Sequence, residues 1–233
     1  MTSRREELAA GLADVRGRID AACAAAGRDR SEVELIVVTK TFPRSDIDLL
    51  ADLGVTDIGE NREQEARAKR EEGAPLSGLR WHFIGQLQSK KAASVARWAD
   101  VVHSVDRDKL IPRLARSAAE AGREVSALVQ VDLDPSPRPG RGGARPPDVR
   151  ALVDAIADSG LTAAGVMAVA PLGADPRVAF SRLAAIAEQV RGDHPQARMI
   201  SAGMSADLEA AIEYGATHLR VGTAILKDRE SHR

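Results

Sequence analysis

The sequence predicts a (β/α)8 TIM barrel of the α/β class, and three observations lead to this fold. Eight short apolar segments alternate with segments of helical periodicity, the pattern of parallel strands joined by right-handed crossovers. The strand segments are continuous apolar runs, such as residues 35–38, which is typical of strands buried on both faces. The length of 233 residues suits a single barrel domain, residues 1–233. A doubly wound open sheet has the same alternation and stays open as the alternative.

An extra helix precedes the barrel repeat. Apolar residues at helical spacing, among them Leu8, Leu12 and Val15, predict a helix over residues 4–26, and Gly27 is a suitable stop. The predicted strands are residues 35–38, 55–58, 81–84, 101–102, 125–131, 161–169, 197–200 and 217–221. The helices between them are residues 45–53, 60–72, 89–98, 107–121, 148–158, 176–191 and 206–214.

One segment rich in proline, glycine and arginine interrupts the pattern. Residues 134–147 lie between the fifth predicted strand and the helix that follows it. Loops at strand ends carry function more often than they divide domains, so we expect a mobile strand-end loop rather than a linker. The sequence leaves the role of this loop open.

Composition excludes several classes of protein. The chain has 33 Lys+Arg and 34 Asp+Glu, so its net charge of −1 gives no electrostatic reason to expect a nucleic-acid partner. A hydrophobic fraction of 44% is too high for a disordered chain. Cys23 is the only cysteine, which excludes an intrachain disulfide and favours a reducing compartment. With no signal-peptide core and no apolar window of membrane length, we expect a cytoplasmic protein with no membrane contact.

A lysine closes the first predicted strand. Lys40 follows an apolar run and Thr39, at the end of the barrel where active sites lie. Burial there would favour the neutral amine, which is the form that makes Schiff bases. A lysine that extends out of the barrel mouth into water is an equally good interpretation of the position alone.

Small and hydroxylic residues follow the last two strands. Residues 201–205 (Ser-Ala-Gly-Met-Ser) follow the seventh strand, and Gly222 and Thr223 follow the eighth, beside Arg220. Loops at these two positions are a recurrent phosphate site in barrels. Helix capping would explain one serine, but not two glycine–hydroxyl pairs at adjacent strand ends. A lysine and a phosphate site together suit pyridoxal 5′-phosphate (PLP), and they suit a sugar-phosphate aldolase equally well.

Histidines near the strand ends have two interpretations. His82 and His103 could carry protons near a ligand, but a hydrogen-bonded structural imidazole is the favoured interpretation of each. No cluster of His, Cys, Asp and Glu has metal-ligand spacing, so no metal is expected.

Taken together, the motifs resemble the YggS/PROSC family of pyridoxal phosphate homeostasis proteins, in order along essentially the whole chain. The residues that carry the resemblance are 37–41 (VVTKT), 59–61 (GEN), 81–85 (WHFIG), 87–88 (LQ), 165–168 (GVMA), 201–212 (SAGMSADLEAAI) and 220–225 (RVGTAI).

The resemblance implies a PLP fold type III barrel, similar to the N-terminal domain of alanine racemase. It implies that Lys40 holds PLP as an internal aldimine and that Arg220 faces the pyridine nitrogen. An arginine there cannot accept a proton, so the ring stays a poor electron sink. The resemblance also implies phosphate binding by Ser201, Gly222 and Thr223, with Asn61 and Met204 near the cofactor.

The expected function is therefore PLP homeostasis: a non-catalytic monomer that holds PLP and serves PLP-dependent apoenzymes. The alternative is an amino-acid racemase, which needs a second proton carrier opposite the lysine. In alanine racemase a tyrosine from a C-terminal domain has this role, and here the chain ends soon after the eighth strand. The sole tyrosine, Tyr214, precedes that strand and is expected at the opposite rim.

Overall fold

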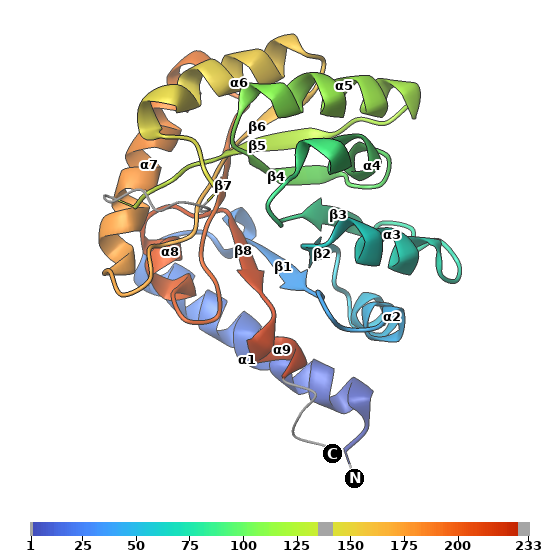
Figure 1. Cartoon of the computed structure of the whole chain (residues 1–233). Coiled ribbons are helices and arrows are strands. Elements are labelled where there is room, and N and C mark those ends of the chain that lie inside the picture. The colour runs from blue at the N-terminus through green and yellow to red at the C-terminus, as the bar shows by residue number, and fades with distance from the viewer. Residues whose placement is uncertain (1, 135–141, 228–233) are drawn as a thin grey trace.

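Eight parallel strands form a closed barrel in the computed structural model, which describes residues 2–134 and 142–227 (Figure 1). Each strand pairs with its neighbours in chain order, and β1 closes the barrel against β8. This confirms the predicted barrel and excludes the open sheet. The strands are β1 (Glu34–Val38), β2 (Asp57–Glu60), β3 (Arg80–Phe83), β4 (Val101–Val105), β5 (Ser126–Gln130), β6 (Thr162–Met167), β7 (Met199–Ser201) and β8 (His218–Val221).

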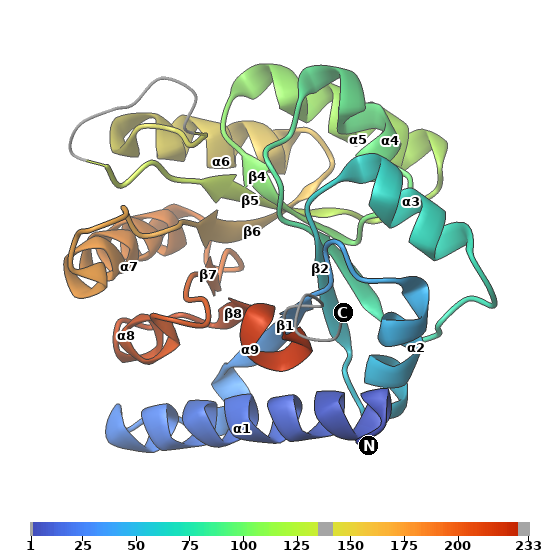
Figure 2. The same cartoon turned by 60° about the horizontal axis from the view of Figure 1, so that its bottom comes forward.

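Helices follow the strands and surround the barrel (Figure 2). They are α1 (Arg4–Ala25), α2 (Arg44–Asp52), α3 (Glu63–Glu71), α4 (Ala92–Ala96), α5 (Ile111–Glu120), α6 (Val149–Asp158), α7 (Pro176–Asp193), α8 (Leu208–Glu213) and α9 (Thr223–Leu226). Short 3-10 turns at Ser89–Lys91 and Asp108–Leu110 begin the segments predicted as single helices before α4 and α5. The short helix α9, after β8, is an element that the sequence pattern did not predict.

The N-terminal helix α1 is covered on one face by the last elements of the chain. Its start is fixed by a capping box, in which Ser3 and Glu6 each bond to the other's backbone N–H. Along its length α1 packs against α8 and α9 (Figure 2). A Cβ at Gly11 would lie 2.6 Å from the carbonyl oxygen of Ile225, so α9 approaches α1 too closely for any side chain there. Cys23 is buried on this face, as an apolar helix residue.

Two kinds of side chain fill the molecule. The large aliphatic core lies between the helices and the outer faces of the strands, and a small cluster of Val101, Leu128, Ala164 and Met167 forms separately. Several strands also bury polar side chains almost completely, including Asp57, His82 and His103. Burial of polar groups is costly unless they are hydrogen-bonded, so these residues must find partners inside the fold.

Part of the proline- and glycine-rich loop can be described. Ala144 pairs with Val131 just beyond β5, and Gln130 donates a side-chain hydrogen bond to the carbonyl of Gly142 at 2.9 Å. Residues 135–141, which make up half of the segment expected to be mobile, lie outside the described residues. Over the described ranges, 2–134 and 142–227, no helix is both long and apolar enough to cross a bilayer.

Candidate functional site

The position of Lys40 follows from the strand order. In the barrel β1 lies between β2 and β8, and the register pairs Val38 with Gly59 and Val37 with Val221. Lys40 leaves the end of β1, so the segments that follow β2 and β8 lie on either side of it. These segments begin with Asn61 on one side and Gly222 on the other.

The backbone around Lys40 is held in an unusual conformation. Thr41 has a φ of +68°, which is rare for a β-branched residue. Its backbone N–H donates to the Glu65 carboxylate at 2.6 Å. On the other side of Lys40, the ammonium of Lys69 donates to the carbonyl of Thr39 at 2.9 Å. Both neighbours of Lys40 are therefore tethered to α3, which fixes where its side chain starts.

The Lys40 side chain itself is exposed. Of the two interpretations of the sequence, the structure therefore supports a lysine that extends out of the barrel mouth into water. The buried lysine of this region is Lys69, which pairs with Glu60 at 2.8 Å and with Glu65 at 2.7 Å. Burial raises the pKa of Glu60, although Lys69 and a hydrogen bond from Thr39 oppose the shift. We expect Lys40, and not Lys69, to be the amine that a ligand can reach.

The ends of β7 and β8 bring two hydroxyl groups together. The Ser205 Oγ lies 3.3 Å from the Thr223 Oγ1, and both residues are at least partly exposed. A Cβ at Gly222 would lie 3.0 Å from the carbonyl oxygen of Val38, so this glycine allows β8 to pass close to β1. Helix α8 begins only at Leu208, so the predicted helix N-terminus at residue 206 is replaced by a turn.

An acidic residue occupies part of this turn. The backbone N–H of Met204 donates to the Asp207 carboxylate at 2.6 Å, and the Met204 side chain is 38% exposed. This N–H is already partnered, so the hydroxyl groups of Ser205 and Thr223 are the side-chain donors that the two loops bring together here.

Ser201 differs from the sequence expectation. Its hydroxyl is fully buried in the barrel, where it accepts from Arg220 Nη1 at 2.6 Å and bonds to His103 Nδ1 at 2.9 Å. A hydroxyl committed to these partners is not free for a phosphate. The structure places Ser205 beside Thr223 instead, a serine that the sequence analysis noted in the loop but did not select as a ligand.

Arg220 is held firmly between two strands. Besides Ser201, it donates from Nη2 to the carbonyl of Ala168 at 2.9 Å, and it is only 5% exposed. Burial lowers the pKa of Arg220 to about 10, with the charge of Asp207 opposing the shift. The guanidinium is still a cation at neutral pH.

Asn61 has an unsatisfied polar atom. Its Oδ1 is buried and has no hydrogen-bond partner among the described residues. A Cβ at Gly85 would lie 2.1 Å from the carbonyl oxygen of Asn61, so the loop after β3 packs directly on the Asn61 backbone. An amide oxygen without a partner, on a backbone that is held in place, can accept a hydrogen bond from a ligand.

The two inward-facing histidines are hydrogen-bonded, as the favoured interpretation predicted. His82 Nδ1 lies 2.8 Å from His103 Nε2, and His82 Nε2 lies 2.8 Å from Asp57 Oδ1. The sequence analysis did not connect these two histidines, because the contact between their rings depends on the register of β3 against β4. Within residues 2–134 and 142–227, no three His, Cys, Asp or Glu side chains could hold a metal ion.

These residues fit pyridoxal phosphate. The molecule has an aldehyde for an accessible amine, a phosphate for paired hydroxyl groups and polar ring substituents for an orphaned amide, and the site offers Lys40, Ser205 with Thr223, and Asn61. A closed barrel with this arrangement defines a class, that of the alanine racemase N-terminal domain. The family model described as "Alanine racemase, N-terminal domain" matches residues 18–230.

Relatives narrow the class further. The pyridoxal phosphate homeostasis proteins of Corynebacterium glutamicum and Mycobacterium tuberculosis are 44% and 42% identical to the chain, over 92% and 97% of it and 99% and 94% of their own lengths. The structure of PipY of Synechococcus elongatus with PLP bound is 34% identical with a TM-score of 0.81, over 94% of this chain and 99% of PipY. The chain belongs to the family of pyridoxal phosphate homeostasis proteins.

Proposed function

We propose that this protein binds PLP through Lys40 and acts in PLP homeostasis, holding the cofactor for delivery without catalysing a reaction on it. The observation that carries the proposal is the placement of an exposed lysine between the orphaned oxygen of Asn61 and the hydroxyl pair of Ser205 and Thr223. Relatives named for PLP homeostasis and a PLP-bound PipY structure support it.

Each side chain has a defined task in this proposal. PLP supplies an aldehyde that condenses with a lysine amine, releasing water, and a ring whose absorbance reports the linkage. Lys40 provides the amine, and its tethered neighbours Thr39 and Thr41 fix its origin. The hydroxyl groups of Ser205 and Thr223 donate to the phosphate, together with the backbone at Gly222.

The ring side of the site is formed by less accessible groups. Arg220 faces the ring nitrogen, where a cation that cannot accept a proton keeps the ring unprotonated. Asn61 accepts from a ring substituent, and the exposed Met204 side chain covers one side of the ring. Ser201 contributes indirectly, by holding Arg220.

The position of Tyr214 favours a carrier over a racemase. Tyr214 lies directly after α8 and before β8, at the N-terminal end of the strands, whereas Lys40 follows the C-terminal end of β1. The phenol is therefore at the opposite rim from the amine and cannot serve as the second proton carrier that racemisation requires. We also propose that the protein is a monomeric, single-domain barrel of the cytoplasm, with PLP-dependent apoenzymes as its partners.

An absorbance titration tests the cofactor proposal. Wild-type protein mixed with PLP is expected to gain the visible band of lysine-bound cofactor, and borohydride is expected to fix the mass of PLP onto Lys40. Lys40→Ala is expected to lose both signals, whereas Lys90→Ala, an exposed lysine in the turn after β3, retains them. An unchanged band in Lys40→Ala contradicts the proposal, and a ketose-phosphate adduct formed in place of PLP would support the aldolase alternative.

Further measurements test the phosphate contacts and the lack of catalysis. Loss of one hydrogen bond to a charged group costs about 1.5–3 kcal/mol, so Ser205→Ala is expected to weaken PLP binding about tenfold or more. Solvent deuterium exchange at Cα over a panel of amino acids is expected to stay at background. Robust exchange would establish the racemase alternative, while transfer of PLP to an added apoenzyme would support the carrier role.

A further inference from the structure

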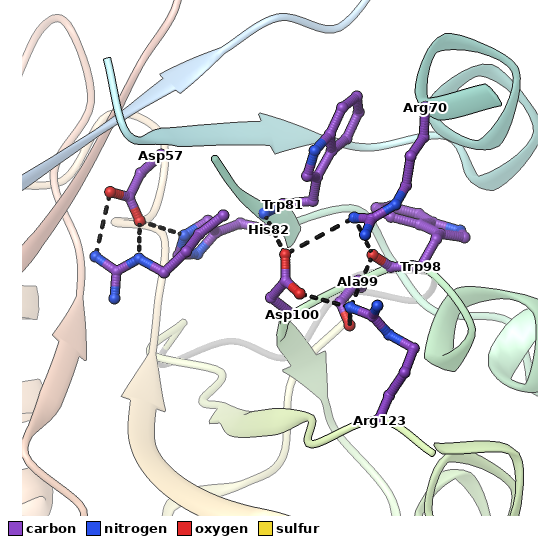
Figure 3. A network of polar contacts seen from close by, with 9 residues as sticks. Asp57, Arg70, Trp81, His82, Trp98, Ala99, Asp100 and Arg123 are labelled. Atoms are coloured by element: carbon purple, nitrogen blue, oxygen red, sulfur yellow. Dashed lines mark hydrogen bonds and ion pairs between the residues drawn. The ribbon is translucent and has the colours of Figure 1, made fainter. Parts of the chain in front are cut away.

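A continuous chain of hydrogen bonds crosses the barrel interior from Arg220. Arg220 Nη1 is 2.6 Å from Ser201 Oγ, which is 2.9 Å from His103 Nδ1. His103 Nε2 is 2.8 Å from His82 Nδ1, and His82 Nε2 is 2.8 Å from Asp57 Oδ1. Figure 3 shows the last of these contacts, between the Asp57 carboxylate and the His82 ring. Five side chains from β2, β3, β4, β7 and β8 are thus joined in one line.

The line of hydrogen bonds leads inward from one end of the barrel. Asp57 is the first residue of β2, at the end where the strands begin (the barrel floor), and Ser201 lies in the interior, where β7 pairs with the first residue of β8. The four residues from Asp57 to Ser201 are fully buried. At the floor, Asp57 Oδ1 also pairs with Arg80 Nε at 2.8 Å, and the Arg80 side chain is 51% exposed. The line therefore starts near solvent on the floor and ends at the arginine of the candidate site.

The direction of each hydrogen bond follows from the donors available. Arg220 can only donate, so Ser201 accepts from it and has its own proton free for Nδ1 of His103. A neutral His103 then carries its proton on Nε2 and donates to Nδ1 of His82. His82 in turn donates from Nε2 to Asp57, which as a carboxylate can only accept. In this arrangement both imidazoles are neutral, and each hydrogen bond between Arg220 and Asp57 has one donor and one acceptor.

Electrostatics favour the neutral form of His103. Burial, reinforced by the charge of Arg220, lowers the pKa of His103 well below its ordinary value. Burial also opposes ionisation of Asp57, but hydrogen bonds from His82, Thr56 and Arg80 outweigh it and hold the pKa of Asp57 below its ordinary value. The Asp57 carboxylate at one end of the line and the Arg220 guanidinium at the other thus fix the direction in which the hydrogen bonds between them run.

A second proton on His82 permits one other arrangement. The imidazolium of His82 donates from both nitrogens, so Nε2 of His103 must accept, and the proton of a neutral His103 is then on Nδ1. Nδ1–H donates to Ser201, whose oxygen now accepts from both His103 and Arg220. In total one proton is taken up from solvent: Ser201 passes its proton to Nδ1 of His103, His103 passes its Nε2 proton to Nδ1 of His82, and the solvent proton replaces the one that Ser201 gave up.

We propose that Ser201, His103, His82 and Asp57 are positioning residues for Arg220, and that protonation of His82 is transmitted along them to the hydroxyl that Arg220 contacts. The consequence for the cofactor rests on the proposed function, in which Arg220 faces the ring nitrogen. The charged and titratable groups that face His82 are Asp57 from β2, Arg80 from β3, His103 from β4 and His218 from β8, and Arg220 acts on the neighbouring His103.

Nitrogen-15 NMR of the imidazoles in the PLP-free protein tests the chain directly. At neutral pH both His82 and His103 are expected as the Nε2–H tautomer. On acidification, the shift of His103 to the Nδ1–H tautomer is expected to share its midpoint with protonation of His82 and with a shift of the Arg220 side-chain signals. An Nδ1–H tautomer of His103 at neutral pH overturns the proposal.

Variants test whether the hydrogen bonds transmit the protonation of His82 to Arg220, or whether the same side chains only pack against one another. His103→Phe and Ser201→Ala are expected to abolish the response of the Arg220 signals to pH, whereas His194→Asn, at a surface pair with Asp154, retains it. An unchanged response in both interior variants overturns the proposal, and if they fail to fold the wild-type tautomers decide alone.

PLP-bound protein provides a second readout. The absorbance band of the cofactor is expected to shift with the His82 midpoint in wild type and to lose this dependence in His103→Phe, with weaker PLP binding by several-fold. A pH-independent band in wild type contradicts the link to the ring nitrogen. If wild-type protein does not bind PLP at all, the proposed function fails. The NMR measurements on PLP-free protein still test whether protonation of His82 is transmitted to Arg220.

Discussion

The ammonium of Lys69 and the carboxylate of Glu60 form a buried ion pair, with Nζ 2.8 Å from Oε1, directly behind the turn that carries Lys40. Lys69 is 7% and Glu60 0% exposed at the side chain. Because the same ammonium also donates to the Thr39 carbonyl, the pair joins α3 to the end of β1. The main chain at Lys40, the lysine of the proposed site, is thus held in part by a second, buried lysine.

Replacing Lys69 tests this support. Lys69→Met leaves the Glu60 carboxylate buried without its partner, so the free energy of unfolding should fall by about 3–5 kcal/mol in urea titrations. The double variant Glu60→Gln/Lys69→Met removes the charge as well and should recover part of the loss. Equal stability of the single and double variants would contradict a role for the uncompensated charge.

Acid stability should depend on His218. Burial lowers the pKa of His218 to about 4, whereas the unfolded chain binds a proton near pH 6.5. Between these values the unfolded state holds more protons, so the free energy of unfolding should fall as the pH drops from about 6.5 to 4, by roughly 2–3 kcal/mol for this group. Urea titrations across this range should show a shallower pH dependence for His218→Asn, and an identical dependence would contradict the prediction.

Gly85 should be essential for the position of Asn61. A Cβ at Gly85 would overlap the Asn61 carbonyl at 2.1 Å, so Gly85→Ala must displace one of two loops at the barrel mouth. We expect a loss of about 1–3 kcal/mol in unfolding free energy, together with weaker PLP binding in the absorbance titration. Gly192→Ala in α7, where a Cβ meets nothing within 4 Å, is the matched control and should change neither binding nor the spectrum.

Two glycines of α1 should respond in opposite directions. At Gly11 a Cβ would lie 2.6 Å from the backbone of Ile225 in α9, whereas at Gly17 it would meet nothing within 4 Å. Gly11→Ala is expected to destabilise by about 1–3 kcal/mol, and Gly17→Ala to stabilise by about 0.5–1 kcal/mol through helix propensity. Thermal unfolding measures both, and shifts of the same sign would show that α9 does not pack on α1 in this way.

The barrel could be predicted because its signal is repeated eight times along the chain. Boundaries failed where polar residues enter the strands: β2 was expected at residues 55–58 but spans Asp57–Glu60. Asp57 and Glu60 are buried only because His82 and Lys69 accompany them, and no periodicity encodes such pairs. Helix α9 was missed since four residues are too few to show a helical pattern.

The site was predictable as a set of strand ends but not as a set of contacts. The motif that contains Ser201 and Ser205 identifies the loop, yet only the structure shows which hydroxyl faces the barrel interior and which faces Thr223. Likewise, His82 and His103 lie 21 residues apart in sequence, and their contact depends on how two strands are staggered. Register across the barrel is a tertiary property, which composition and spacing do not determine.

In the turn at residues 39–41 the main chain is held in place, whereas the side chain of Lys40 is not. The main chain on both sides of Lys40 is tied to α3, while the lysine's own aliphatic stem projects into water. In the proposed role, release of the aldehyde consumes one water, which hydrolyses the bond to the amine, and the side chain can turn for this step while the main-chain tethers to α3 stay in place. If Lys40 holds PLP as proposed, the cofactor can come and go at a flexible side chain while the tethered main chain keeps the rest of the site assembled.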